Sequence, residues 1–383
     1  MQSISIPFSQ IMRKLFLNIQ RFAVVLLAIV LLVYGLVAAR NLLYPIVMST
    51  LFAFLLFPFV QFFEKRGLPR IVSTFIVVFT ASAFVIGLAY ILYSQIGFLV
   101  RELPALKAHA KENIAQITAP ISSNIGVSPD EFRGWMNEQI NIFFAEDGAF
   151  FSAIFPSTTG TLIAVALMPS YIYLFLYYRD KFYQFIIMVI PNDKQPKAAG
   201  VISQVTQVTR RYMNGVCIVV AILIILNTIG LFFIGVKFAL LLGIIWGLCN
   251  FIPYFGVLIG AIFPLAMAIF TGETAREAAS VFAFFLIIQF IENYILTPHI
   301  TGGGVQVNPL VTIVSIIAAA WIWGIPGMFV VIPIVGIAKI VLDSNARTRP
   351  LAYLIGTNGT EEHAITMEKV RAFLNVKNLT GRK

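Results

Sequence analysis

Long apolar runs that are almost free of charge limit most strongly how this chain can fold. Six of them have the length of a membrane-spanning helix, about 20 residues: Phe22–Ala39, Leu42–Phe63, Ile71–Ser94, Thr161–Tyr178, Val216–Ile234 and Ala278–Leu296. The chain has 383 residues, 59% hydrophobic and 11% charged, with a mean hydropathy of +0.89. This is more apolar surface than one soluble core buries. We therefore expect an all-α polytopic integral membrane protein. The first run lacks a small-x-small cleavage site, which argues against a signal peptide.

The charged residues alternate between loops in the way that orients membrane proteins. Segment 96–156 carries four basic and seven acidic residues, whereas segment 179–211 carries six basic and two acidic ones. The first is expected outside and the second inside, with both termini cytoplasmic. The formal net charge of +10 therefore reflects topology, and we expect the lipid bilayer, not nucleic acid, as the partner.

Two polar stretches carry one-sided apolar patterns. Ser128, Pro129 and Glu131 form a capping box ahead of an amphipathic helix, and segment 181–213 predicts interfacial cytoplasmic helices. The sequence thus predicts five regions. They are a three-helix membrane region (1–95), an exterior amphipathic helical segment (96–158), a fourth span with cytoplasmic interfacial helices (159–215), a transport region (216–342) and a cytoplasmic tail (343–383).

The region 216–342 repeats one pattern twice. The span Val216–Ile234 precedes two apolar arms of fourteen residues, 238–251 and 257–270, and the span Ala278–Leu296 precedes the arms 310–323 and 328–342. An arm of fourteen residues reaches only about 21 Å, less than the roughly 30 Å of a bilayer core. We expect six full spans and two broken hairpins, hence up to ten apolar segments. Four short complete spans would give the same parity.

Loop charges give the two units opposite orientations, which predicts an inverted repeat like that of secondary transporters. Proline at each tip leaves backbone groups available to a polar solute. The residues that we expect along a solute or ion pathway lie at the tips and in the polar stretch after the second span: Asn250, Pro253, Tyr254, Gly256, Gln289, Glu292, Asn293, Thr297, Pro298, Asn308, Pro309, Gly324, Pro326 and Gly327. Asn308 and Pro309 also have the pattern of a helix cap.

Glu292 is an acidic residue well inside an apolar run. A buried carboxylate in a membrane helix predicts a cation or proton site, and a wetted structural position at the helix end is the alternative. The run Gly302, Gly303 and Gly304 is interpreted as a hinge, although it also frees backbone groups for a ligand.

The order and spacing of several short motifs resemble one family of bacterial membrane proteins, the autoinducer-2 exporter family. The motifs are Phe251–Gly256, Ile291–Asn293, Thr297–Gly302, Asn308–Leu310, Trp323–Gly327 and Pro333. The resemblance implies an inner-membrane permease and a homo-oligomer. Members have been linked to autoinducer-2 export and, in some cases, to sodium or proton antiport. Ala318–Ala320 and Asn250 depart from the glycines and the acidic residue that some members carry.

The leading hypothesis is therefore export of a small polar solute, with autoinducer-2 as a candidate. The alternative is a sodium or other cation/proton antiporter that uses Glu292, and a membrane scaffold acting through its outer segment is more remote. An enzyme is not expected, since HExxH, GxSxG and Walker A patterns are missing. Cys217 and Cys249 form no CxxC pair, so we expect neither a metal site nor a cofactor.

Overall fold

The computed structural model describes residues 8–125, 128–143, 159–253, 255–271, 275–301, 306–357 and 359. These ranges contain helices and no β-strand, so the predicted all-α fold is confirmed. The helices are α1 (Phe8–Ala38), α2 (Arg40–Lys65), α3 (Arg70–Ile125), α4 (Pro129–Phe143), α6 (Thr159–Tyr177), α7 (Arg179–Val189), η1 (Asn192–Lys194), α8 (Gln195–Ile234), α9 (Ala239–Cys249), α10 (Phe255–Thr271), α11 (Ala275–Ile291), η2 (Glu292–Thr301), α12 (Pro309–Trp323), α13 (Ile325–Asp343) and α14 (Arg349–Ile355).

Six helical stretches in the described ranges are long and apolar enough to cross a membrane: those in α1, α2, α3, η1 with α8, α11 with η2, and α13. α13 corrects the prediction, because it begins at Ile325 and reaches 19 residues instead of forming a short arm. Pro326 stands in its first turn, where a proline is compatible with a helix start. The apolar helix Val165–Tyr177 within α6 is shorter than the span expected there.

Two predicted boundaries fall inside continuous helices. α3 runs over 56 residues across the boundary at 95/96, so the third span continues directly into the segment expected outside. α8 runs over 40 residues across the boundary at 215/216, which joins the expected interfacial helix to the fifth span. Pro196 stands in its first turn and the left-handed Gly235 ends it, and no proline interrupts the residues between them.

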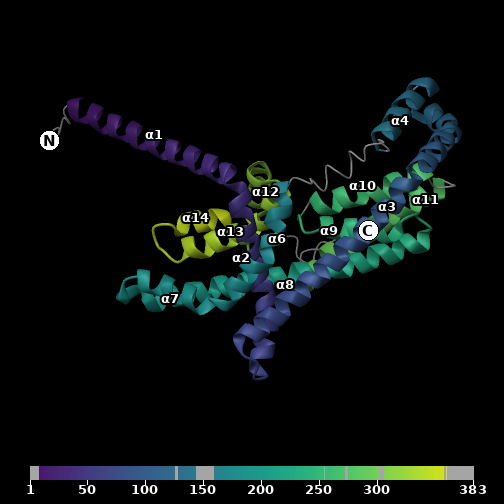
Figure 1. The fold of residues 1–383 in the computed structure, drawn as a ribbon. Helices are drawn as coiled ribbons and strands as arrows, with labels where there is room; N and C mark the ends of the chain where they lie inside the picture. The colour runs from purple at the N-terminus through teal and green to yellow at the C-terminus, as the bar shows by residue number, and fades with distance from the viewer. Residues whose placement is uncertain are drawn as a thin grey trace, which may run out of the picture.

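Two pairs of packed helices stand where the sequence predicts the repeated pattern of the second half. α9 packs against α10 and α12 packs against α13, while α8 lies against both α9 and α13. α10 and α9 lie along α3, whereas α13 and α14 lie on the other side, by α2 (Figure 1). Gly243 and Gly247 face α8, where an added Cβ would overlap Thr228 and Ile224. These glycines allow the close approach of α9 to α8.

Three apolar clusters form the interior. The largest surrounds Trp246 of α9, which is 1% exposed, and joins α3, α8, α10 and α11. A second joins α2, α3 and α6 around Val60. The third lies at the hairpin tips. By contrast, α1 extends away from the other helices (Figure 1), and its apolar stretch Ile19–Ala38 buries none of its residues. Such a surface is compatible with lipid and not with water.

The elements outside the expected spans agree in part with the sequence. α4 begins as predicted, with the Glu131 backbone N–H donating to Ser128 Oγ at 3.2 Å. In the tail, α14 follows Thr348 and was not expected, while the segment 367–376, whose sequence has a helix-like pattern, lies outside the described residues.

Candidate functional site

The first hairpin turns within a few residues after α9. The Gly256 backbone N–H donates to the Ile252 carbonyl, and that of Phe255 donates to the Pro253 carbonyl, both at 2.8 Å. Asn250 and Pro253 are half-buried at this tip, and Tyr254 lies outside the described residues. A tight hydrogen-bonded turn therefore separates α9 from α10, as the broken-helix pattern predicts.

The second hairpin turns at a single residue, Gly324. Its φ of +65° and ψ of −142° are a conformation that only glycine adopts readily. The Met328 backbone N–H donates to the Gly324 carbonyl at 3.2 Å, and Pro326 is half-buried in the first turn of α13.

A buried glycine just after each tip lets the two arms of each hairpin meet. A Cβ on Gly256 would overlap the Cys249 carbonyl, and a Cβ on Gly327 would overlap the Ala319 carbonyl. Both glycines are buried. Of the three glycines predicted along the pathway, Gly256 and Gly327 are thus explained by the same close contact in both repeats.

The tips of the two hairpins meet. The ring of Phe251, beside the first tip, lies edge-on to Phe329 of α13 with centroids 5.3 Å apart. Phe52 of α2 stacks on the same Phe329 ring at 6.1 Å. Phe329 belongs to the third apolar cluster, the tip cluster, and the rings of Phe251 and Phe52 pack against it. The tip cluster joins both hairpins to α2 and α8: Leu51, Tyr212, Met213, Ile252, Ile316, Phe329, Val330 and Ile332.

Two hydroxyls on α8 are buried at or near the tip cluster without a hydrogen-bond partner. Tyr212 is 7% exposed and Thr209, one turn earlier, is 1% exposed. Neither Tyr212 Oη nor Thr209 Oγ1 has a partner among the described residues. Leaving such a group unpaired costs about 1–3 kcal/mol. Sequence analysis missed both residues, because a single Tyr or Thr in an apolar helix has no distinctive pattern.

Asn250 and Glu292 come together across the two repeats. The Asn250 side chain donates a hydrogen bond to the Glu292 carboxylate, and Glu292 Oε2 is buried with no partner among the described residues. Glu292 begins the π-helix η2, which continues α11 to Thr301 and packs on α8. π-Helical segments occur often at functional sites. The sequence indicated the two polar residues but not this helix.

The remaining predicted pathway residues lie in two groups. Gln289 is half-buried on α11, while Asn293, Thr297 and Pro298 are exposed on η2. Asn308 is at the other end of α12 from the tip, and Pro309 follows it. The Asn308 Oδ1 accepts from the Val311 N–H at 2.8 Å, its Nδ2 donates to the Leu354 carbonyl at 2.6 Å, and the predicted cap is confirmed. The expected hinge Gly302–Gly304 lies outside the described residues.

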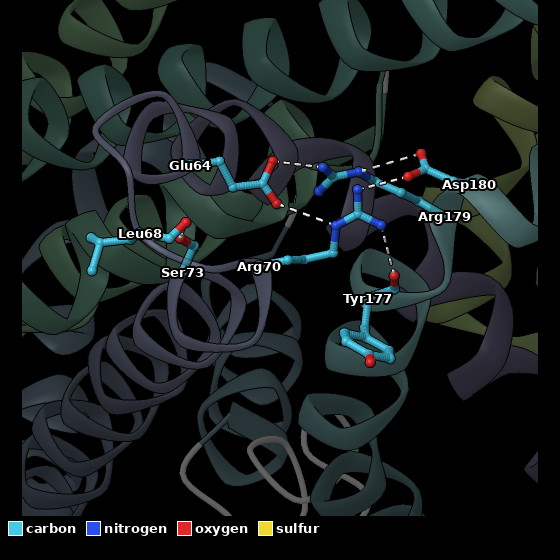
Figure 2. Close-up of polar contacts among 7 residues, drawn as sticks. All are labelled: Glu64, Leu68, Arg70, Ser73, Tyr177, Arg179 and Asp180. Carbon is cyan, nitrogen blue, oxygen red and sulfur yellow. Dashed lines mark hydrogen bonds and ion pairs between the residues drawn. The ribbon is translucent and has the colours of Figure 1, made fainter.

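An ion-pair cluster joins α2, α3, α6 and α7 (Figure 2). Arg179 Nη2 contacts Glu64 Oε2 at 2.6 Å, and Arg70 Nη2 contacts Asp180 Oδ2 at 2.6 Å. Arg70 Nε also lies 3.5 Å from Glu64 Oε1, and Arg70 Nη1 donates to the Tyr177 carbonyl at 3.3 Å. From the sequence, charges of this kind indicate only how the loops are oriented across the membrane. The pairing of Glu64 with Arg179 and of Arg70 with Asp180 joins residues more than 100 positions apart, and no local pattern predicts it.

Comparisons with known proteins agree with this arrangement. Residues 26–347 match the family described as AI-2E family transporter. The AI-2 transport protein TqsA of Escherichia coli strain K12 is 26% identical over 88% of this chain and 96% of its own length. YrrI of Bacillus subtilis strain 168, provisionally named a transport protein, is 24% identical over 80% of this chain and 87% of its own length. The antiporter hypothesis draws no support from these comparisons.

Proposed function

Because the chain belongs to the AI-2E family of transporters, we propose that it exports a small polar solute across the bacterial inner membrane. Autoinducer-2 is the first solute to test, since one relative of similar length is named an AI-2 transport protein. At 26% identity, the likeness supports the transport class more strongly than it supports the solute.

The observation that carries the proposal is the contact between the two hairpin tips. Phe251 and Phe329 bring together two interrupted helices. In secondary transporters, such interruptions near the middle of the membrane supply the solute site. We propose that the solute passes where these tips meet. We also propose that both hairpins are re-entrant, so that each enters the membrane and returns to the same side.

The polar groups near this junction fit a small hydroxylated solute. The unpaired hydroxyls of Tyr212 and Thr209 can donate and accept. Asn250 and Glu292 lie at the first hairpin and the π-helix, and Glu292 Oε2 has a free lone pair. A solute rich in hydroxyls would satisfy the Tyr212 and Thr209 hydroxyls and Glu292 Oε2, which have no partner among the described residues.

The decisive experiment links the tips covalently during transport. A Phe251→Cys and Phe329→Cys pair in a Cys217→Ala, Cys249→Ala background is joined by a short thiol cross-linker, and autoinducer-2 efflux is followed in proteoliposomes. We expect efflux to stop on cross-linking, because the tips then cannot separate. The matched control is Phe75→Cys with Phe79→Cys, two rings 5.9 Å apart on α3 alone.

Three outcomes are distinguishable. Efflux that persists through tip-linked protein contradicts a pathway between the tips. Efflux that is absent from the uncross-linked parent excludes autoinducer-2 as the solute. Proton movement driven by a sodium gradient in the same vesicles would instead assign the protein to antiport.

A further inference from the structure

A polar cavity of about 390 Å³ lies between α8 and α13, apart from the hairpin tips. This volume is in the range of small-ligand pockets. The polar residues that line the cavity are Lys197, Gln204, Gln306, Lys339, Asp343 and Ser344. The other lining residues are Gly200 and Val201 of α8 and Ile340 of α13.

Helix periodicity and a backbone bridge build this cavity. Lys197, Val201 and Gln204 repeat at helical spacing on one face of α8, and Lys339 and Asp343 do so on α13. Gln306 is held at the wall because its neighbour Val307 forms the isolated β-bridge with Gly356. The Lys339 side chain runs alongside the same Gly356.

The cavity has more hydrogen-bond donors than acceptors, and its cations are unpaired. Within the described ranges, neither Lys197 nor Lys339 has an acidic partner, whereas Asp343 is paired with Arg349 at 3.5 Å. The amides of Gln204 and Gln306 likewise form no hydrogen bond with a described residue. Lys339 is half-buried near the end of an otherwise apolar helix. A bound anion would give this ammonium the charged partner that the described residues do not provide.

We propose that this cavity is a binding site for a small anion carrying a phosphate or carboxylate group. Two ammonium groups from facing helices and two amide donors form a set that suits such oxygens. The anion is either a soluble metabolite or the headgroup of an anionic lipid, since both present the same oxygens. Another cavity, beside Arg70, Tyr177 and Lys181, suits an anion less well because Arg70 is already paired with Glu64 and Asp180. The proposal does not depend on transport.

Binding of inorganic phosphate to the full chain in phosphatidylcholine nanodiscs tests the proposal, by equilibrium dialysis at low ionic strength. We expect saturable binding that is weakened about tenfold by Lys197→Gln and by Lys339→Gln, since each removes one charged contact. Lys194→Gln is the matched control, because Lys194 precedes Lys197 by one turn and does not line the cavity. Circular dichroism and gel filtration check that each variant is folded.

Two results overturn the proposal. Absence of saturable phosphate binding by the folded wild type is one, and equal weakening by Lys194→Gln is the other, because it indicates diffuse surface attraction. A second set of nanodiscs containing phosphatidylglycerol identifies the source of the anion. Competition with phosphate there supports a lipid headgroup in the cavity, and unchanged phosphate binding supports a soluble anion.

Discussion

The side-chain amide of Asn250 donates a hydrogen bond to the carboxylate of Glu292, although the two residues belong to different repeats. Asn250 follows α9 of the first repeat, and Glu292 begins the π-helix that ends the second span. This bond joins the first hairpin tip to the second repeat independently of the aromatic contact between the tips.

Removing either partner of this bond should destabilise the protein, and the effects of the two substitutions should not add. Asn250→Ala and Glu292→Gln are each expected to cost about 1–3 kcal/mol, because a partly buried hydrogen bond is lost or weakened. The double variant should cost less than the sum, with a coupling of about 0.5–2 kcal/mol. Equilibrium unfolding in mixed detergent measures all three. Asn293→Ala is the control, since this exposed neighbour should combine additively with Asn250→Ala. Additivity of Asn250→Ala with Glu292→Gln would contradict the contact.

Gly256→Ala should disrupt the first hairpin. The added Cβ would overlap the Cys249 carbonyl, and such overpacking typically costs about 1–3 kcal/mol. Thermal unfolding in detergent should show a lower midpoint, and solute efflux should fall with it. Gly97→Ala is the control, because nothing lies within 4 Å of its Cβ position and alanine favours the helix. Equal effects of the two substitutions would rule out the close contact of α9 with α10.

Arg179→Ala should lower the stability of the protein more than the loss of a surface ion pair does. Arg179 and Glu64 are 21% and 19% exposed at their side chains, so the substitution leaves a half-buried carboxylate with only its longer contact to Arg70. We expect a loss of about 1–3 kcal/mol, measured by thermal unfolding. Arg349→Ala breaks a pair that is 75% and 58% exposed and should cost less than about 1 kcal/mol. A loss for Arg179→Ala as small as that control would show that the cluster contributes little.

Tyr212→Phe should lower solute efflux without lowering the stability of the protein. The Tyr212 hydroxyl is buried without a partner among the described residues, so its removal should leave the unfolding midpoint unchanged or raise it. If the hydroxyl contacts the solute, efflux should fall about tenfold. Tyr90→Phe, at a position 70% exposed on α3, is the matched control. A normal efflux rate in Tyr212→Phe would remove this residue from the pathway. A lower midpoint would indicate that a water molecule pairs with the hydroxyl.

Local patterns predicted most of the helices. Apolar runs marked α1 and α2, the capping box marked the start of α4, and prolines and glycines marked both hairpin tips. α3 and α8 were longer than expected because a helix continues when apolar residues give way to polar ones, provided that no breaker intervenes. Hydropathy marks where a membrane ends and not where a helix ends.

Contacts between distant segments could not be predicted in the same way. The sequence singled out Asn250 and Glu292 separately, but their hydrogen bond depends on how α9 and η2 each pack on α8. The π-helix, the unpaired hydroxyl of Tyr212 and the pairing of Glu64 with Arg179 likewise arise from tertiary packing. Pathway roles for Asn308 and Pro309 stay predictions, and the hydrogen bonds of the Asn308 side chain to Leu354 of α14 and to Val311 of α12 already account for its polar atoms.

The continuity of α8 has a mechanical consequence. One uninterrupted helix of 40 residues, about 60 Å long, carries Lys197 at the cavity, Tyr212 at the tip cluster and Thr228 against Gly243 of α9. Because no break interrupts α8, a rotation of this helix that widens the cavity would also turn the Tyr212 hydroxyl. The same rotation would shift the face of α8 that packs on α9 of the first hairpin. If an anion binds in the cavity and the solute passes at the tips, one continuous helix links the two sites.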